Sequence, residues 1–272
     1  MRVVMIHAVA GSIRPAELAF QDEFPAAELV NLMDDSLLTD YGDKINSRLR
    51  RRMSQLICYC AEHGADAVGL ACSVYAPVVE SARDLVDIPV LSSYEAVMED
   101  AVSYGRRIGI IASVPATLRD SEYYLRQTAE LKGMTVDPQF FLDEHLMQLM
   151  KVDGQEEFRQ RLAGAVQQMA PGVDAILLSQ FSMATALADL RKITDVPLLS
   201  APHSSARRFK RLLTVEVGDR IPGALNHPQH HTDDAPLQSQ GQLGGLLQSQ
   251  VVPHRSHEGH AQDAPHSEID DR

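Results

Sequence analysis

The sequence repeats itself over a long distance. Residues 66–72 (Asp-Ala-Val-Gly-Leu-Ala-Cys) align without gaps to residues 174–180 (Asp-Ala-Ile-Leu-Leu-Ser-Gln), at an offset of 108 residues. The same offset aligns residues 87–92 to residues 195–200, and both segments begin with Asp-x-Pro. A chance likeness between two strand–helix units is the alternative, but the shared spacing argues against it. Because a period this long is not that of a solenoid, we predict two similar halves related by a pseudo-twofold axis.

A second match joins the beginnings of the two halves. Residues 3–9 align to residues 108–114 at an offset of 105. Helical patterns separate the apolar runs, at residues 43–63, 119–132 and 155–169. The other apolar runs are residues 67–71, 89–91, 175–178 and 197–199. Continuous apolar strands that alternate with helices are typical of parallel sheets covered on both faces. We therefore predict an α/β fold of two pseudo-symmetric parallel-sheet halves that face a central cleft.

The composition changes near Asp219 and suggests domain boundaries. From there to residue 272 the chain has eight acidic and three basic residues, seven of its eleven histidines and no aromatic residue. This composition predicts a disordered low-complexity tail at 219–272; a weak metal-binding tract is the alternative for its histidines. The first half is expected to cover 1–100 and about 200–215, and the second half 101–199.

Composition also excludes several classes of partner. The net charge of −12 argues against a nucleic-acid-binding surface, and no apolar run approaches the ~20 residues that cross a membrane. Three cysteines without a secretory signal favour a reducing compartment, so we expect a cytoplasmic protein. There is no phosphate-binding glycine loop and no zinc-ligand spacing, so we predict no cofactor and no metal.

Two polar residues stand at equivalent strand ends. Cys72 ends one apolar run, and Gln180 ends its counterpart in the second half. Since ligands bind beyond the carboxyl ends of parallel strands, we expect Cys72 and Gln180 to approach one ligand from opposite sides. For Cys72, a buried apolar role is the alternative.

The loops after the first strand of each half carry further candidates. Residues 7–12 and 113–117 are small and bear hydroxyl groups, which suits them to hold a carboxylate. The candidate binding residues are His7, Ser12, Ser73, Ser113, Thr117 and Ser182. Helix capping is the alternative for Ser73, Ser113, Thr117 and Ser182. A structural core role is the alternative for His7, and a capping role for His203, which follows Pro202.

The repeat, the cysteine after an apolar strand and the turn that begins at Ser182 resemble the aspartate/glutamate/hydantoin racemase superfamily, over roughly residues 1–213. This superfamily is related to maleate isomerase and arylmalonate decarboxylase. Asp34-Asp-Ser-Leu37 is similar to a segment of some of its members. In the superfamily, two cysteines exchange protons on opposite faces of a carbon next to a carboxylate. Cys72 matches the first cysteine, whereas Gln180 stands at the position of the second. Arylmalonate decarboxylases also keep only one of the two cysteines, but in the other half.

The resemblance implies a cofactor-independent enzyme of the racemase or isomerase type that acts on a small carboxylic acid. Cys72 would be the acid/base or the nucleophile, with a lowered pKa, and His203 would supply a proton or a carboxylate contact. A single cysteine favours one-sided chemistry such as decarboxylation or lysis. A non-catalytic carboxylate-binding protein is the alternative. The resemblance also implies a homodimer.

Overall fold

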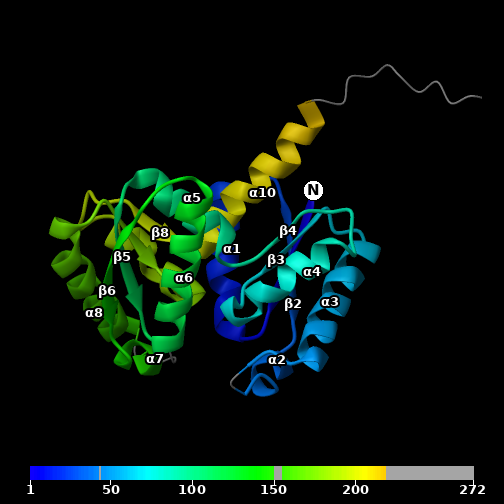
Figure 1. Cartoon of the computed structure of the whole chain (residues 1–272), viewed down its shortest axis with the longest axis horizontal. Coiled ribbons are helices and arrows are strands. Elements are labelled where there is room, and N and C mark those ends of the chain that lie inside the picture. Colours follow the sequence, from blue (N-terminus) through cyan, green and yellow to red (C-terminus); the bar gives the residue numbers. More distant parts are fainter. Residues whose placement is uncertain (43, 150–154, 219–272) are drawn as a thin grey trace, which may run out of the picture. The chain divides into compact units, whose positions relative to one another are not determined.

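The computed structural model describes residues 1–42, 44–149 and 155–218, with no account of the side chains of 215–218. It contains two four-stranded parallel sheets (Figure 1). The first has the order β2-β1-β3-β4, from β1 (Arg2–His7), β2 (Glu28–Met33), β3 (Ala67–Leu70) and β4 (Val90–Leu91). The second repeats it as β6-β5-β7-β8, from β5 (Arg107–Ala112), β6 (Asp137–Leu142), β7 (Ala175–Leu178) and β8 (Leu198–Ser200). The predicted α/β fold with two parallel-sheet halves is confirmed, while the predicted tail at 219–272 lies outside the described residues.

Helices connect the strands in the same order in both halves. The first half has α1 (Ile13–Glu23), α2 (Ser36–Thr39), α3 (Ser47–Glu62), α4 (Val79–Arg83) and α5 (Glu95–Tyr104). The second has α6 (Pro115–Leu131), α7 (His145–Leu149), α8 (Gln155–Met169), α9 (Leu187–Leu190) and α10 (Ala201–Gly218). Short 3-10 helices follow β1, β3 and β7, namely η1 (Ala10–Ser12), η2 (Ser73–Val78) and η4 (Phe181–Ala186), and η3 (Ala170–Gly172) follows α8.

An aspartate carboxylate accepts a hydrogen bond from the backbone at the start of the first strand of each half. The backbone N–H of Arg2 donates to Asp66 Oδ2 at 2.7 Å, and that of Arg107 donates to Asp174 Oδ2 at 2.9 Å. Each aspartate stands just before the central strand β3 or β7, so it fixes the start of β1 or β5 beside that strand. These are the residues that the repeat aligns, and they have the same structural role in both halves.

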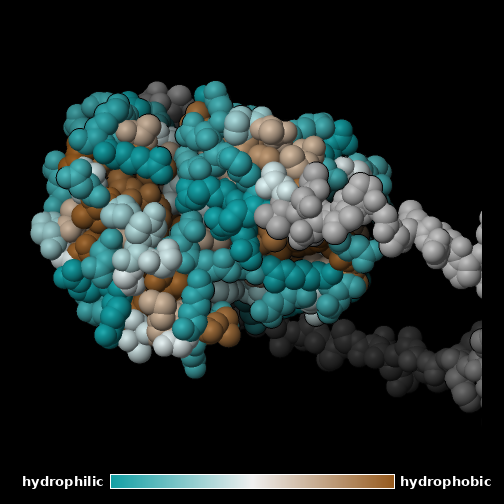
Figure 2. Space-filling model, turned by 90° about the horizontal axis from the view of Figure 1, so that it is seen from above, coloured by the Kyte–Doolittle hydropathy of each residue, from teal (hydrophilic) through white to brown (hydrophobic). Residues whose placement is uncertain are grey.

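The two faces of each sheet lie in different apolar cores. One face of the first sheet (Val3, Met5, Ala67) and one face of the second (Ile108, Ile110, Ala175, Leu177) belong to one continuous cluster with α1, α5, α6 and α10. The opposite face of the first sheet packs with α3 and α4, and that of the second with α7, α8 and α9. Because both faces are covered, the central strands contain continuous apolar runs, as the sequence predicts. Figure 2 shows a largely hydrophilic exterior on one face, with apolar side chains visible in recesses.

Two helices cross from one half to the other. Helix α5 follows the first sheet but contacts β7 and β8, and α10 follows the second sheet but contacts β3 and α1. The first half was expected to end at residue 100, inside α5, so this boundary stays a prediction. The expected return of residues 200–215 to the first half also stays a prediction; α10 contacts α1 and β3 of the first half and β8 and η4 of the second.

Edge strands β2 and β6 and helices α1 and α5 are absent from the expected elements. β2 and β6 are partly exposed, so they lack the continuous apolar run of the central strands. Helix α6 begins at Pro115 rather than at residue 119, because proline is favoured in a first helical turn. Within the described residues, no helix has an apolar stretch long enough to cross a membrane.

Candidate active site

The turns after β3 and β7 both lie at the seam between the halves. Helix η1, which follows β1, contacts η4, which follows β7. At a second contact between the halves, the Tyr94 hydroxyl lies beside the hydroxyls of Ser73 on η2 and Ser121 on α6. The carboxyl ends of the two sheets therefore meet along one seam, which is where ligands bind in open parallel sheets.

Cys72 occupies the end of β3 at this seam. Its side chain is partly buried, and the backbone N–H of Val74 donates a hydrogen bond to the sulfur. Burial raises the pKa of the Cys72 thiol to about 11, and the bond from Val74 offsets only part of that effect. The structure thus does not provide the expected lowering of this pKa: burial outweighs the single N–H donor and favours the protonated thiol at neutral pH.

Gln180 is engaged at the equivalent position of the second half. Its Oε1 accepts the backbone N–H of Ser113 at 3.1 Å, and its Nε2 donates to Ser113 Oγ at 2.6 Å. Ser113 directly follows β5 and is buried. No hydrogen bond joins Gln180 to Cys72 in the part of the chain that the structure describes. The two candidates thus lie at equivalent strand ends, but only Gln180 is tied to the first loop of its own half.

His7 and Ser12 form a closed buried network. His7 Nδ1 lies 2.7 Å from Ser12 Oγ, and Nε2 lies 2.9 Å from Asn31 Oδ1. Ser12 Oγ also donates to the Val9 carbonyl at 2.8 Å. Burial lowers the pKa of His7 more than the hydrogen bond from its ring to the Asn31 amide oxygen raises it, which favours the neutral ring. With both ring nitrogens occupied, His7 supports the loop after β1, in agreement with the structural alternative for this residue.

His203 is also buried and bonded through both ring nitrogens. Nδ1 lies 2.8 Å from Ser200 Oγ, and Nε2 lies 3.4 Å from Asp22 Oδ2 on α1. Burial lowers its pKa, and the hydrogen bond that the ring donates to Asp22 opposes this only in part. The ring therefore links the N-terminus of α10 to α1 across the two halves.

The helix-capping alternative is wrong for Ser113 and Thr117. The cap residue of α6 is Val114, with no side-chain cap bond, and Thr117 lies within the first turn. Ser73 and Ser182 lie inside η2 and η4, whose cap residues are Cys72 and Gln180. Ser73, Thr117 and Ser182 are partly buried, and Ser73 also borders a cavity.

Two buried hydroxyls at the seam, those of Tyr94 and Ser121, are not indicated by any sequence pattern. Tyr94 and Ser121 are 3% and 0% exposed, and neither oxygen has a well-formed hydrogen bond. Unpaired buried hydroxyls cost free energy, so a polar ligand atom or a water molecule would be stabilised there. The Tyr94 ring stacks on that of Tyr124 with centroids 4.5 Å apart, which fixes its position. Neither residue has a strand-end position or a repeat partner of the same type, so no pattern singles it out.

Cavities of about 440 and 350 Å³ lie along this side of the seam. Tyr123, Tyr124 and Pro77 border both, Tyr94 borders the larger, and Ser73 and Asp120 border the smaller. Each is large enough for a small organic acid. The open space therefore begins one residue away from Cys72.

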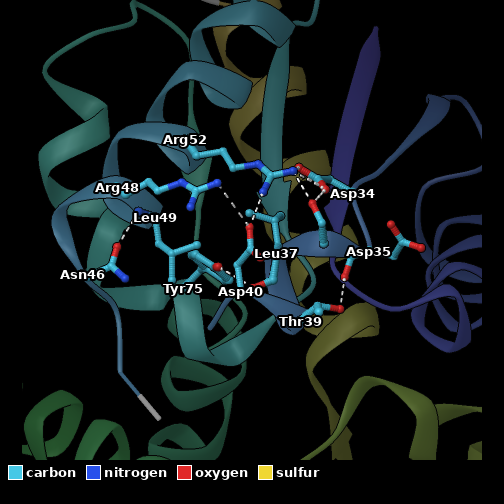
Figure 3. Close-up of polar contacts among 11 residues, drawn as sticks. Asp34, Asp35, Leu37, Thr39, Asp40, Asn46, Arg48, Leu49, Arg52 and Tyr75 are labelled. Carbon is cyan, nitrogen blue, oxygen red and sulfur yellow. Dashed lines mark hydrogen bonds and ion pairs between the residues drawn. The ribbon is translucent and has the colours of Figure 1, made fainter. Parts of the chain in front are cut away.

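The turn after Cys72 is fastened to the Asp34-Asp-Ser-Leu37 segment (Figure 3). Tyr75 is fully buried, and its hydroxyl donates to the Leu37 carbonyl at 2.8 Å. Arg52 on α3 joins Asp34 at 2.6 Å and Asp40 at 3.0 Å, and it also bonds Ser36. The Tyr75 bond holds α2 against η2, and the Arg52 contacts hold the same segment against α3. The segment that the resemblance singles out thus supports the Cys72 turn through Tyr75.

Comparison with known proteins agrees with this architecture. The family model Asp/Glu/Hydantoin racemase matches residues 37–138. The structure is similar to allantoin racemase from Klebsiella pneumoniae, with a TM-score of 0.61, 20% identity, and coverage of 79% of this chain and 89% of that chain. The resemblance to the aspartate/glutamate/hydantoin racemase superfamily is confirmed. No curated protein matches the sequence significantly.

Two further solved structures, both of racemases, share the fold at low identity. Allantoin racemase from Pseudomonas fluorescens aligns with a TM-score of 0.58 and 18% identity, covering 79% of this chain and 92% of that chain. Glutamate racemase from Thermus thermophilus, in complex with beta-chloro-D-alanine, aligns with a TM-score of 0.57 and 13% identity, covering 79% and 81%. At these identities the similarity establishes the fold, and the chemistry rests on the residues of this chain. Within the described ranges, no cluster of three His, Cys, Asp or Glu side chains could hold a metal ion.

Proposed function

We propose that the protein is an enzyme of the racemase or isomerase type that acts, without a cofactor, at the carbon next to the carboxylate of a small acid. Cys72 is the group that transfers the proton. The observation that carries this proposal is the place of Cys72, at the carboxyl end of a central strand and one residue away from a cavity at the seam.

The protonation state of Cys72 favours the role of proton donor. With its pKa raised to about 11 by burial, the thiol is protonated at neutral pH. A thiol can protonate a carbanion that forms beside a carboxylate, whereas abstraction of a proton requires the thiolate. The N–H of Val74 stabilises the thiolate that remains after the transfer.

A single acid on one face limits the outcome. The Gln180 amide has no acid/base pKa near neutrality, and the buried His7 and His203 rings have both nitrogens occupied. Protonation from the Cys72 face alone gives one enantiomer. We therefore favour decarboxylation, lysis or isomerisation over racemisation.

A screen in D₂O tests the proposal. We would incubate the full chain with 2-substituted carboxylic acids and malonates and follow the carbon next to the carboxylate by NMR. We expect deuterium to enter that position in one stereochemical sense, and we expect Cys72→Ser to lose the activity while Cys58→Ser keeps it. Turnover that persists in Cys72→Ser would contradict the role of the thiol.

A non-catalytic carboxylate-binding protein is the second candidate. It is favoured by Gln180, which cannot act as an acid or base near neutral pH, and by the high pKa of the Cys72 thiol. Such a protein would bind a carboxylate from the screen, and its Cys72→Ser variant would bind equally well. It would introduce no deuterium into any of the acids.

A further inference from the structure

The orientation of the Gln180 side chain is fixed by its partner. A backbone N–H can only donate, so the atom that faces the N–H of Ser113 at 3.1 Å must be the amide oxygen. The amide nitrogen then faces Ser113 Oγ, at 2.6 Å. Both atoms of the amide are held by one residue, and Gln180 presents a fixed N–H₂ group at the end of β7.

This arrangement leaves two donor hydrogens unused. Gln180 Nε2 has two hydrogens and spends one on Ser113 Oγ. Ser113 Oγ accepts that hydrogen, so its own O–H remains free to donate. Among the residues that the structure describes, no hydrogen bond uses either of these hydrogens. Ser113 is 1% exposed, and a buried O–H without an acceptor is costly unless a ligand or a water molecule provides one.

The first half has no such pair. The offset of 105 residues that aligns β1 to β5 places Ala8 opposite Ser113, and Ala8 has no hydroxyl. Cys72 stands where Gln180 stands in the repeat. The acid is therefore in one half and the fixed neutral donors are in the other.

We infer that Gln180 and Ser113 form an oxyanion site, with the Gln180 N–H and the Ser113 O–H as donors to a carboxylate oxygen of the substrate. This inference rests on the proposed function. Charge spreads onto the carboxylate oxygens when the adjacent carbon is a carbanion, and fixed donors aimed at such oxygens stabilise it. When Cys72 protonates the carbon, the electron pair returns from these oxygens to form the new C–H bond. The S–H bond breaks, and its electron pair stays on sulfur as the thiolate.

Protection of Cys72 from alkylation tests the inference through binding alone. The full chain is alkylated with iodoacetamide at pH 9 in increasing sodium malonate, and labelling of Cys72 and Cys58 is quantified by mass spectrometry. We expect malonate to protect Cys72 but not Cys58. Gln180→Glu replaces the N–H donors with acceptors, so we expect the half-protecting malonate concentration to rise at least about 10-fold, as for loss of a hydrogen bond to a charged group.

Three further variants serve as controls and keep the test decisive. Ser113→Ala should raise the half-protecting concentration several-fold, and Gln180→Met should match Gln180→Glu without adding charge. Gln167→Glu, at an exposed position on α8, should change nothing. Circular dichroism would verify that each variant is folded.

Two results would overturn the oxyanion site: equal protection in Gln180→Glu, Gln180→Met and the wild type, or no protection by malonate at any concentration. Failure of the proposed function looks different. In that case Cys72→Ser would keep its turnover, or no acid would turn over at all, while the effect of Gln180→Glu on malonate binding persisted.

Discussion

In both halves an aspartate before the central strand holds the backbone N–H of an arginine at the start of the first strand, Asp66 with Arg2 and Asp174 with Arg107. At the opposite end of the same strands the halves differ. Cys72 is a protonated thiol whose turn is tied to α2, whereas Gln180 is an amide locked onto Ser113. The two halves thus share the same contact at the amino ends of their strands, and they differ in their chemical groups at the carboxyl ends. The predictions that follow test this contrast.

The largest expected effect is loss of the acid in the first half. Cys72→Ser should lower turnover by at least about 10²-fold, the scale for a positioned acid/base, with an unchanged melting temperature. Gln180→Cys is the companion variant: it removes the amide donor, so binding should weaken, but a thiol on the second side should add proton exchange from the opposite face. Chiral NMR analysis in D₂O would detect it as racemisation. Full activity in Cys72→Ser would contradict the proposal that the first half supplies the acid.

The reactivity of Cys72 should follow its raised pKa. Alkylation by iodoacetamide should increase about tenfold per pH unit without a plateau up to pH 9, since the thiolate is a minor species below pH 11. In urea the alkylation rate of Cys72 should level off above a pH of ~8.5, the ordinary pKa of a cysteine thiol. At neutral pH this corresponds to a native rate on the order of 10²-fold lower. A plateau near neutrality in the native protein would show that the thiol is not a proton donor there.

The two halves share one apolar core, so we expect them to unfold as one unit. Phe209 on α10 is fully buried in the shared cluster and lies 6.2 Å from the Phe20 ring on α1. Phe209→Ala should lower the free energy of unfolding by about 3–5 kcal/mol. Hydrogen exchange should then rise in β3 and β7 together. Independent halves would instead leave β7 protected.

The stability that the Asp174–Arg107 contact gives the second half should depend on pH. Hydrogen bonds from Arg107, first from its side chain and then from its backbone, lower the pKa of Asp174. A lowered pKa in the folded state stabilises the protein above the unfolded value of about 3.9, and this contribution is lost as the pH falls through the folded value. The melting temperature of the wild type should therefore fall more steeply below pH 4 than that of Asp174→Asn. If the melting temperatures of the two proteins fell in parallel with pH, the Asp174–Arg107 contact would contribute nothing to stability.

Removal of residues 219–272 should have the smallest effect. Their composition has too few apolar residues to offset the entropy of ordering. We expect the melting temperature and the turnover to change little in a chain that ends after residue 218. A stability loss of more than ~2 kcal/mol would show that this segment packs on the rest of the protein.

The repeat and the apolar runs predict most of the fold. The central strands β1, β3, β5 and β7 are buried on both faces over most of their length, so each contains a continuous apolar run. Helix α8 has the predicted bounds, and Gly133, with φ of 65°, ends α6 as expected of a left-handed residue. Edge strands β2 and β6 escape such reasoning because partial exposure breaks the apolar run. The crossing of α5 and α10 escapes it because sequence order says nothing about which sheet a helix covers.

The site is less predictable than the fold. The strand-end rule selects Cys72 and Gln180, but the hydrogen-bond partners of a side chain depend on neighbours that are distant in sequence. The pairing of Gln180 with Ser113 spans 67 residues. The closed networks around His7 and His203 involve Asn31 and Asp22, which have no distinctive motif. The rise in the pKa of Cys72 comes from burial by other elements, which the local sequence does not report.

The continuous core between the sheets has a consequence for the history of this chain. The inner faces of both sheets belong to one apolar cluster, and α5 and α10 each cover the sheet of the other half. A single half would expose that face to water, so an ancestor the size of one half would have been stable as a pair of identical subunits exchanging their last helices. Such a homodimer must carry the same residue at both strand ends. Only after the two copies were joined in one chain could one position be a cysteine and the other a glutamine.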